Sequence, residues 1–345
     1  MKKKPPSLQD WSDLYKAAIE FKTLECWIWM WSANMFGVQN PVTDEIGYCH
    51  VLGYLGDAFG LVVYQGTEGL EGFSKLQSVE TPPDSVETLS YMTTLMASFT
   101  DRRAVKKPDL QIIKKLGLKF RGRNEWPLFR NYRPGYYPWY LTKEEAQYLT
   151  LALQQTIDVA LRVQEDPDLT TPPNVDLYFV RVPRKKGQSL KWRDEWLKPT
   201  PLEPSEVVVE PVDEIRLKKI RKRASRREGI WEIDYFYSSA GIREKGERPY
   251  FPYLFLWVHS PSTLILTTHL VTPPKPMAEY MAEFSEKFVK LLEDLQYLPK
   301  EVRVQNEDLF KVVEPITSQL GIKLRLAHKL PALAATRARM EAFPL

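Results

Sequence analysis

The sequence predicts two domains, an α+β domain followed by an α/β domain, and three observations support this. The length of 345 residues exceeds the roughly 100–200 residues of a typical single domain. The stretch 198–214 places four prolines among acidic and β-branched residues, a composition typical of an extended connector. After residue 230, strand-like and helix-like segments follow in the order β-β-β-α-β-α-β-α. We therefore place the boundary near 204 and expect domains 1–204 and 205–345.

Composition excludes several classes of protein. Apolar side chains make up 43% of the chain and charged ones 27%, so a disordered chain is excluded. The mean hydropathy is -0.36, no apolar run approaches the roughly 20 residues of a spanning helix, and no apolar stretch follows the basic start MKKKPPSLQDW. Cys26 and Cys49 are the only cysteines, which excludes a disulfide framework and a cysteine-rich zinc site. We expect a cytoplasmic protein.

The first domain mixes helical and strand patterns. Thr142 and Glu145 form a capping-box signature, and apolar residues at helical spacing follow them, which predicts a helix over 142–164. YCHVLGY and GLVVYQG flank the turn signal LGDAF and predict a hairpin, whose glycines lack the spacing of a phosphate-binding loop. Further predicted elements are a helix at 10–21, a strand at 26–31 and a strand at 175–182.

An arginine- and aromatic-rich segment occupies residues 120–140. Its arginines are Arg121, Arg123, Arg130 and Arg133, and eight aromatic residues lie among them. Guanidinium groups pair with phosphate and aromatic faces stack on unpaired bases, so one interpretation is single-stranded nucleic acid binding. The other is a loop fixed by Pro127, Pro134 and Pro138, with the aromatics packed under the arginine stems.

A second basic run lies at 215–228. It contains Arg216, Lys218, Lys219, Arg221, Lys222, Arg223, Arg226 and Arg227. Such a cluster neutralises phosphates without reading sequence. Acidic residues bracket the run and its apolar face is thin, so a solvated helix or linker is an equally open interpretation.

The order of elements in the second domain follows from its patterns. Three strand-like runs form an antiparallel meander, and helical and strand patterns then alternate. The predicted strands are 231–237, 252–259, 263–271, 301–304 and 322–326, and the predicted helices are 277–295, 307–320 and 331–341.

With these residues, the segment 228–345 resembles the ribonuclease-H-like catalytic core of transposases and retroviral-type integrases. WEIDYFY resembles the first strand of that family, and the resemblance implies that Asp234 is the first catalytic aspartate. YLFLWVHSPSTLILTTHLV resembles the second strand, turn and third strand, with His259 where many members have an aspartate. VRVQNEDLF followed by LGIKL resembles the fourth-strand region, with Gln305 where the second aspartate is expected; Glu341, thirty-six positions later, corresponds to the final glutamate.

The missing second carboxylate matters for the chemistry that the resemblance implies. Two divalent ions about 4 Å apart, Mg²⁺ or Mn²⁺, must be held by clustered carboxylates. Gln305 is neutral and cannot supply a bridging negative charge, and Asp308 would replace it only if the strand end were displaced by three residues.

The whole chain also resembles a family of uncharacterised two-domain bacterial proteins in which an RPGYYPW-type segment precedes such a C-terminal half. That family implies no activity.

Three functions remain open at this stage. We expect a binding or scaffolding protein with a degenerate ribonuclease-H-like domain, without a resident cofactor, whose partner is nucleic acid or another protein. The alternative is a metal-dependent nuclease or strand-transfer relative with Asp234, Asp308 and Glu341 as catalytic residues and Asp234 and Glu341 as metal ligands. The third is a protein-interaction module with an aromatic docking loop.

Overall fold

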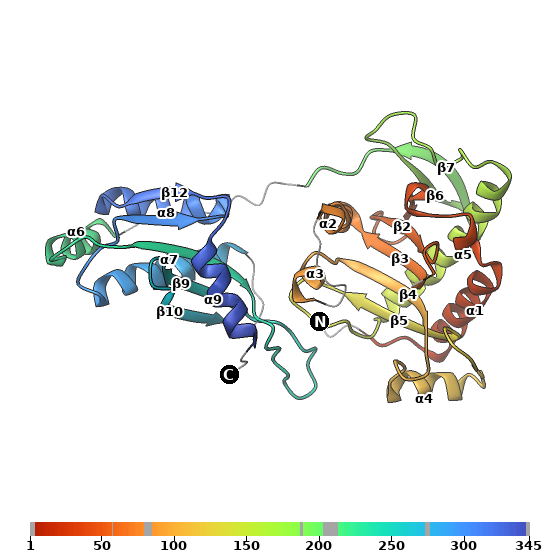
Figure 1. Cartoon of the computed structure of the whole chain (residues 1–345). Coiled ribbons are helices and arrows are strands. Elements are labelled where there is room, and N and C mark those ends of the chain that lie inside the picture. Colours follow the sequence, from red (N-terminus) through yellow and green to blue (C-terminus); the bar gives the residue numbers. More distant parts are fainter. Residues whose placement is uncertain are drawn as a thin grey trace. The chain divides into compact units, whose positions relative to one another are not determined.

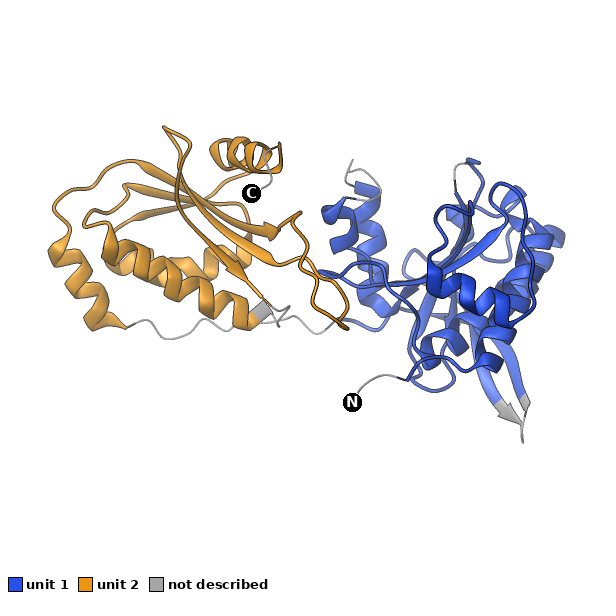
Figure 2. Cartoon of the chain, turned by 90° about the horizontal axis from the view of Figure 1, so that it is seen from below, with its two compact units in different colours: residues 1–203 blue, residues 204–345 orange. Residues whose placement is uncertain are grey.

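The structure, a computed structural model, divides the chain into two compact units, residues 1–203 and 204–345 (Figures 1 and 2). It describes residues 4–56, 58–78, 85–186, 189–202, 213–272 and 277–342. Residues 203–212 of the predicted connector lie outside the described residues. Both units are mixed α/β, and each is built on one sheet.

The first unit contains a seven-stranded sheet with the order β5-β4-β3-β2-β1-β6-β7 (Figure 1). Its strands are β1 (Phe36–Gln39), β2 (Ile46–Leu52), β3 (Phe59–Gln65), β4 (Thr94–Thr100), β5 (Trp126–Tyr132), β6 (Tyr178–Lys186) and β7 (Ser189–Leu197). Neighbouring strands are antiparallel except β1 and β6, which are parallel. The parallel pair needs a long crossover, and the chain between β5 and β6 supplies it.

Helices cover both faces of this sheet. They are α1 (Leu8–Leu24), α2 (Gly66–Ser78), α3 (Val86–Ser90), α4 (Lys107–Lys115) and α5 (Lys143–Glu165). Residues from α1 and α5 share a buried core with one set of alternating strand residues, for example Leu61 and Val63. Leu70 of α2 packs with the opposite set, including Val62 and Tyr64. The period of two in the strands therefore separates the two cores.

Capping residues define the two long helices of this unit. The Thr142 hydroxyl accepts from the Glu145 N–H, and Glu145 accepts from the Thr142 N–H (2.9 Å), which confirms the predicted helix. Ser7 and Asp10 form the same arrangement at the start of α1. The predicted hairpin is also confirmed, because β2 and β3 pair antiparallel.

Two sequence predictions in this unit are wrong. Residues 26–31 form no strand; Cys26–Ile28 is a short 3-10 helix, and the Trp29 indole donates to the carbonyl of Ala160 on α5 (2.9 Å). The apolar run thus packs against α5 and, through the ring contacts of Trp27 with Phe59 and Phe99, against the sheet without being a strand of it. The centre of segment 120–140 is not an irregular loop but the edge strand β5. Pro127 is compatible with it because an edge strand need not donate every N–H.

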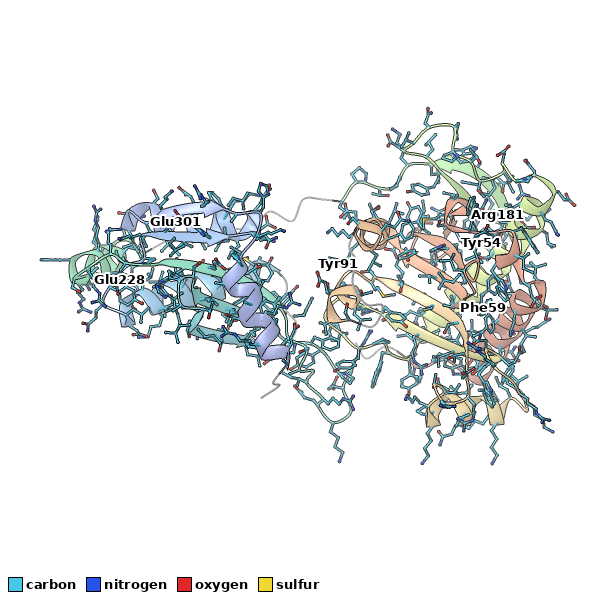
Figure 3. The ribbon with its side chains drawn as sticks, in the orientation of Figure 1. Tyr54, Phe59, Tyr91, Arg181, Glu228 and Glu301 are labelled. Atoms are coloured by element: carbon cyan, nitrogen blue, oxygen red, sulfur yellow. The ribbon has the colours of Figure 1, made fainter. Side chains whose placement is uncertain are left out.

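A cluster of charged side chains attaches β6 and β7 to α5. Arg181 of β6 donates to the Gln155 side chain (2.9 Å) and pairs with Asp158 (3.0 Å) on α5, and it also pairs with Asp194 of β7 (Figure 3). Arg162 of α5 reaches the same Asp194 at 2.6 Å. The outer hairpin therefore has polar anchors on the long helix.

The second unit contains a five-stranded sheet with the order β10-β9-β8-β11-β12. Its elements are α6 (Glu214–Arg223), β8 (Ile230–Tyr237), β9 (Tyr253–His259), β10 (Leu264–Val271), α7 (Met277–Asp294), β11 (Glu301–Val304), α8 (Glu307–Leu320), β12 (Lys323–Leu326) and α9 (Pro331–Ala342). From β8 onward, this is the predicted order of elements. β8, β9 and β10 are antiparallel, and β11 runs parallel to both β8 and β12.

The two faces of this sheet carry different helices. Trp231, Ile233 and Trp257 lie in the core that includes α6, α7 and α8. Leu256 and Val258, which alternate with them, pack against Leu333 of α9. Alternate residues of β8 thus point toward α9, and Asp234 belongs to this set because it lies two positions from Glu232, which contacts that helix.

Candidate functional site

Asp234 lies on β8, which pairs with both β9 and β11. Burial raises the pKa of its carboxyl group to about 6, and two weaker effects oppose this rise. One is the N–H of Tyr235, which donates to the carboxylate at 2.9 Å, and the other is the positive charge of Arg337. The neutral form of the Asp234 carboxyl group is therefore more stable, relative to the ionised form, at this site than in water.

Arg337 of α9 connects the two carboxylates that the resemblance assigns to metal binding. Its guanidinium donates to Glu341 one helical turn later (2.9 Å), lies over the ring of Phe236 (4.5 Å from the centroid), and acts electrostatically on Asp234. Arg337 is thus paired with Glu341, and its effect on the pKa of Asp234 is smaller than that of burial.

Gln305, Asp308 and His259, which the sequence analysis compared with the family's other catalytic positions, have partners within the unit. Gln305 is exposed and donates through its amide to the carbonyl of His328 (3.1 Å). Asp308 lies in the first turn of α8 and pairs with Lys311 at 3.5 Å. The ring of His259 contacts the Ser262 hydroxyl (2.7 Å).

These residues do not fit a two-metal centre. Among the described residues, no group of three or more His, Cys, Asp or Glu side chains is arranged to hold a metal ion. Asp234, Asp308 and Glu341 are all described, so this statement covers the full predicted catalytic set.

Sequence reasoning missed Glu232, which is fully buried two positions before Asp234. One carboxylate oxygen accepts from the Ser260 hydroxyl (2.8 Å), and the other accepts from the N–H of Leu333 (2.9 Å) in the first turn of α9. A carboxylate at a helix N-terminus is stabilised by the free N–H groups there. Two acidic residues at alternate positions of an apolar strand were a usable signal, because such positions share a face.

The basic run at 215–228 forms α6 and the segment that leads to β8. Arg216 is held by two carboxylates of α7, Glu286 (2.8 Å) and Glu293 (2.8 Å), which raises the pKa of the guanidinium and lowers the pKa of Glu293. Arg227 donates to the carbonyl of Gly321 (2.7 Å) at the end of α8, and Arg226 pairs with Glu228. These arginines stabilise the unit.

The other cations of α6 are exposed. They are Lys218, Lys219, Arg221, Lys222 and Arg223. Two of them have contacts at long distance: Lys218 to Glu214 at 3.5 Å, and Arg221 to the carbonyl of Gln319 at 3.4 Å. The helix is attached to the unit through Leu217 and Ile220, which are buried. The cationic side of α6 therefore faces solvent.

Two of the four arginines of segment 120–140 form ion pairs within the fold, and the other two are exposed. Arg130 is buried and forms two bonds to Asp109 (2.9 and 2.8 Å), so this guanidinium is occupied inside the fold. Arg133 is half-exposed and pairs with Glu145 at 3.0 Å. Arg121 and Arg123 are exposed, in the connection that precedes β5.

Comparison with known proteins finds a matching family model in each unit. Residues 11–181 match a domain of unknown function, DUF7309, and residues 216–341 match a second one, DUF6930. No curated protein matches the chain.

Structural similarity to solved proteins is weak. The catalytic core domain of BIV integrase matches with 14% identity and a TM-score of 0.24, over 33% of this chain and 64% of that one. The Mos1 strand transfer complex matches with 13% identity and a TM-score of 0.23, over 58% of this chain and 57% of that one. The chain thus spans less than two thirds of either protein.

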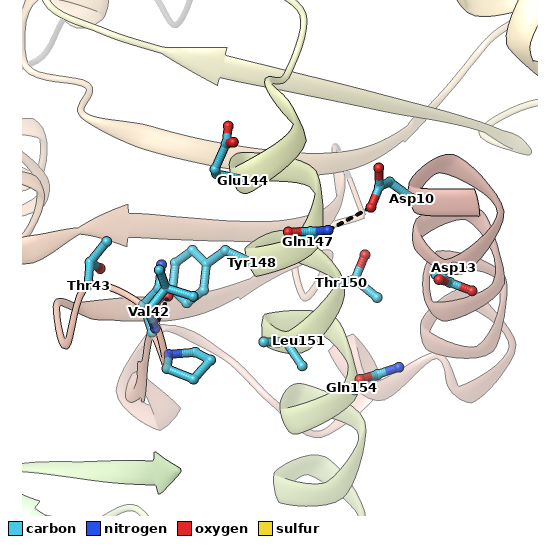
Figure 4. A pocket seen from close by; sticks show the side chains of 12 residues that line it. Asp10, Asp13, Val42, Thr43, Glu144, Gln147, Tyr148, Thr150, Leu151 and Gln154 are labelled. Carbon is cyan, nitrogen blue, oxygen red and sulfur yellow. Dashed lines mark hydrogen bonds between the residues drawn. The ribbon is translucent and has the colours of Figure 1, made fainter. Parts of the chain in front are cut away.

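A groove of about 520 Å³ lies in the first unit, between α1, α5 and the turn after β1 (Figure 4). Asp10, Asp13 and Glu144 supply carboxylates to its lining. The Asp10 carboxylate is engaged, because it caps α1 and accepts from the Gln147 amide (2.8 Å). No predicted site residue lines this groove.

Across the described segments, no helix is long and apolar enough to cross a membrane.

Proposed function

We propose that this chain binds nucleic acid through the phosphate backbone, and that its DUF6930 unit is a ribonuclease-H-like domain used for binding and not for cleavage. The observation that carries the proposal is α6. Buried Leu217 and Ile220 fix this helix, and the five exposed cations named above lie on its outer side. Such a surface pairs with phosphates and does not read bases.

The fold assignment is supported by the order and direction of the strands. A meander of β8, β9 and β10 precedes two strands, β11 and β12, that are parallel to β8 and alternate with helices. This is the β-β-β-α-β-α-β-α order on which the resemblance to transposase and integrase cores was based. Fold alone does not establish cleavage.

The absence of cleavage is supported by Arg337. Arg337 is paired with Glu341, burial has the largest effect on the pKa of Asp234, and Gln305 adds none of the negative charge that two metal ions require. Arg337 therefore competes with a divalent ion for Glu341.

Salt-dependent binding tests the proposal. Fluorescence anisotropy with a labelled DNA duplex would compare the full chain with the variant Lys219→Gln/Lys222→Gln. The control variant, Lys245→Gln/Lys329→Gln, removes the same charge from exposed positions of the same unit. Loss of two phosphate contacts is expected to reduce the slope of log K against log salt by about 1.8 and the affinity at 0.1 M salt by about tenfold or more. Equal behaviour of the two variants would contradict the proposal.

The nuclease alternative has its own test. Manganese binding measured by calorimetry on the wild type and on Asp234→Asn distinguishes the two functions, because only a metal centre would bind the ion through Asp234. We expect no specific binding by either protein. Binding by the wild type that disappears in the variant would restore the catalytic interpretation and would call for cleavage assays.

A further inference from the structure

We infer that the DUF7309 unit carries its own phosphate-binding surface, formed by α4 and the two connections that flank it. The inference takes one element from the proposed function, namely that the ligand is a nucleic acid. We call this region the α4 surface. Its cations are Arg102, Arg103, Lys106, Lys107, Lys114, Lys115, Lys119, Arg121 and Arg123. Sequence reasoning had identified only the last two.

The α4 surface gathers excess positive charge of its unit in one short segment. Residues 102–123 contain nine Lys and Arg and a single acidic residue, a net charge of +8 in a chain whose total is +4. All nine cations are exposed. The rest of the chain is therefore acidic on balance, and the positive charge of this unit is localised.

The acidic side chains of this region are engaged elsewhere. Asp109, the acidic residue inside the segment, is buried and bound by Arg130. At the two ends, Asp101 accepts from the backbone N–H of Asn124 (3.0 Å), and Glu125 pairs with Lys22 of α1 at 3.0 Å. Asp109 and Glu125 are thus paired with other cations, whereas Asp101 retains its charge beside the α4 surface, and Glu20 and Glu25 of the neighbouring α1 region line grooves next to it.

The geometry of α4 keeps its lysines on the outside. Ile113 is buried, and Leu110 and Ile112 pack against the core, so the apolar side of the helix is covered. Lys107 and Lys114 lie seven positions apart on the same exposed side, a rise of about 10 Å along the helix axis. Figure 1 shows α4 at the margin of its unit, outside the seven-stranded sheet.

The chemistry of the α4 surface favours nucleic acid over a membrane. A helix that binds a lipid surface inserts an apolar face, whereas the apolar face of α4 belongs to the core. Within residues 102–123, all of which are described, none of the exposed side chains is a large apolar one. A nucleic acid needs only the cations.

The same surface favours the phosphate backbone over unpaired bases. Stacking requires free aromatic faces, but the Arg102 guanidinium lies over the ring of Trp126 (5.4 Å from the centroid). Phe120 stacks on Tyr15 and also contacts Trp126. We therefore expect a duplex to bind at least as well as a single strand of the same length.

The test uses the full chain and changes one basic surface at a time. Lys114→Gln/Lys115→Gln removes two charges from the α4 surface. Lys75→Gln/Lys198→Gln removes two exposed charges of the same unit, on α2 and after β7, and serves as the control. Duplex binding is followed by anisotropy between about 50 and 200 mM salt, where phosphate contacts dominate the salt dependence. Circular dichroism and thermal unfolding verify that each variant is folded.

The expected result is a slope reduced by about 1.8 and an affinity reduced by about tenfold or more at 0.1 M salt for the α4 variant, with the control unchanged. Wild-type affinity in the α4 variant, together with weakened binding in Lys219→Gln/Lys222→Gln, would overturn this inference and leave the proposed function standing. No binding of duplex or single strand by the wild type would overturn both. Binding of phosphatidylserine vesicles but not of nucleic acid would overturn both and identify a lipid partner.

Discussion

Arg130 and Asp109 form a buried two-bond ion pair, with Nη1–Oδ1 and Nη2–Oδ2 distances of 2.9 and 2.8 Å. Asp109 also accepts from the backbone N–H of Lys106 (3.1 Å) at the start of α4, and the Arg130 guanidinium lies over the ring of Tyr140 (4.7 Å). The pair therefore joins the edge strand β5 to α4. An arginine that the sequence suggested as a ligand of phosphate instead positions the helix that carries other cations.

Replacing Arg130 by methionine is expected to destabilise the first unit strongly. The change leaves the Asp109 carboxylate buried without its partner, which typically costs about 3–5 kcal/mol of unfolding free energy. Denaturant unfolding measures the loss. The matched control is Arg133→Met, whose half-exposed pair with Glu145 should contribute about 1 kcal/mol or less. Similar losses in the two variants would contradict the structural role of the Arg130 pair.

Replacing Glu232 by alanine is expected to destabilise the second unit and to loosen α9. Two buried donors, the Leu333 N–H and the Ser260 hydroxyl, would lose their acceptor, at a cost of about 1–3 kcal/mol each. Chemical unfolding gives the total, and hydrogen exchange at the Leu333 amide reports the helix end directly. Glu228→Ala, at a partly exposed surface pair, is the control. An unchanged exchange rate at Leu333 would show that Glu232 does not hold α9.

Asp234 predicts a defined pH dependence. Its folded-state pKa of about 6 lies above the ordinary value of 3.8, so between these values the folded protein retains a proton that the unfolded chain releases. The contribution of Asp234 to the stability of the second unit should therefore decrease as pH rises from about 4 to 6 and level off above that range.

The variant Asp234→Asn isolates this effect, because asparagine stays neutral at every pH. We expect the variant to melt at a higher temperature than the wild type at pH 7 and at nearly the same temperature at pH 4. Comparing thermal unfolding at several pH values removes the contribution of all other groups. A variant less stable than the wild type at pH 7 would mean that the attraction of Arg337 for the ionised Asp234 outweighs burial.

The elements of the second unit were predictable from sequence because each has its own local signal. The strand WEIDYFY is rich in aromatic and β-branched residues, and Pro331 opens the last helix. The run at 26–31 had the same apolar content but no partner strand, and its position is set by contacts with α5 such as the Trp29–Ala160 bond. Apolar composition alone does not separate a strand from a short buried turn.

The candidate site was less accessible to sequence reasoning, because its deciding contacts join distant residues. Nothing local indicates that Arg216 meets Glu293 or that Glu232 meets Leu333. The Arg337–Glu341 pair was a usable signal, since it lies at the i, i+4 spacing of a helical ion pair. The lysine pairs of α4 were equally visible, but their exposure depends on Ile113 and Asp109 turning inward.

The bond between Glu232 and Leu333 joins the first strand of the second unit to its last helix, across 101 positions of the chain. During synthesis, β8 leaves the ribosome long before α9, so the Glu232 carboxylate has no helix end to accept from until residues 331–342 have emerged. Contacts of such sequence separation also slow folding, because a long loop must close before they form. The second unit is therefore not expected to complete its folding before residues 331–342 have emerged, and the α9 side of its sheet is open to chaperones until then.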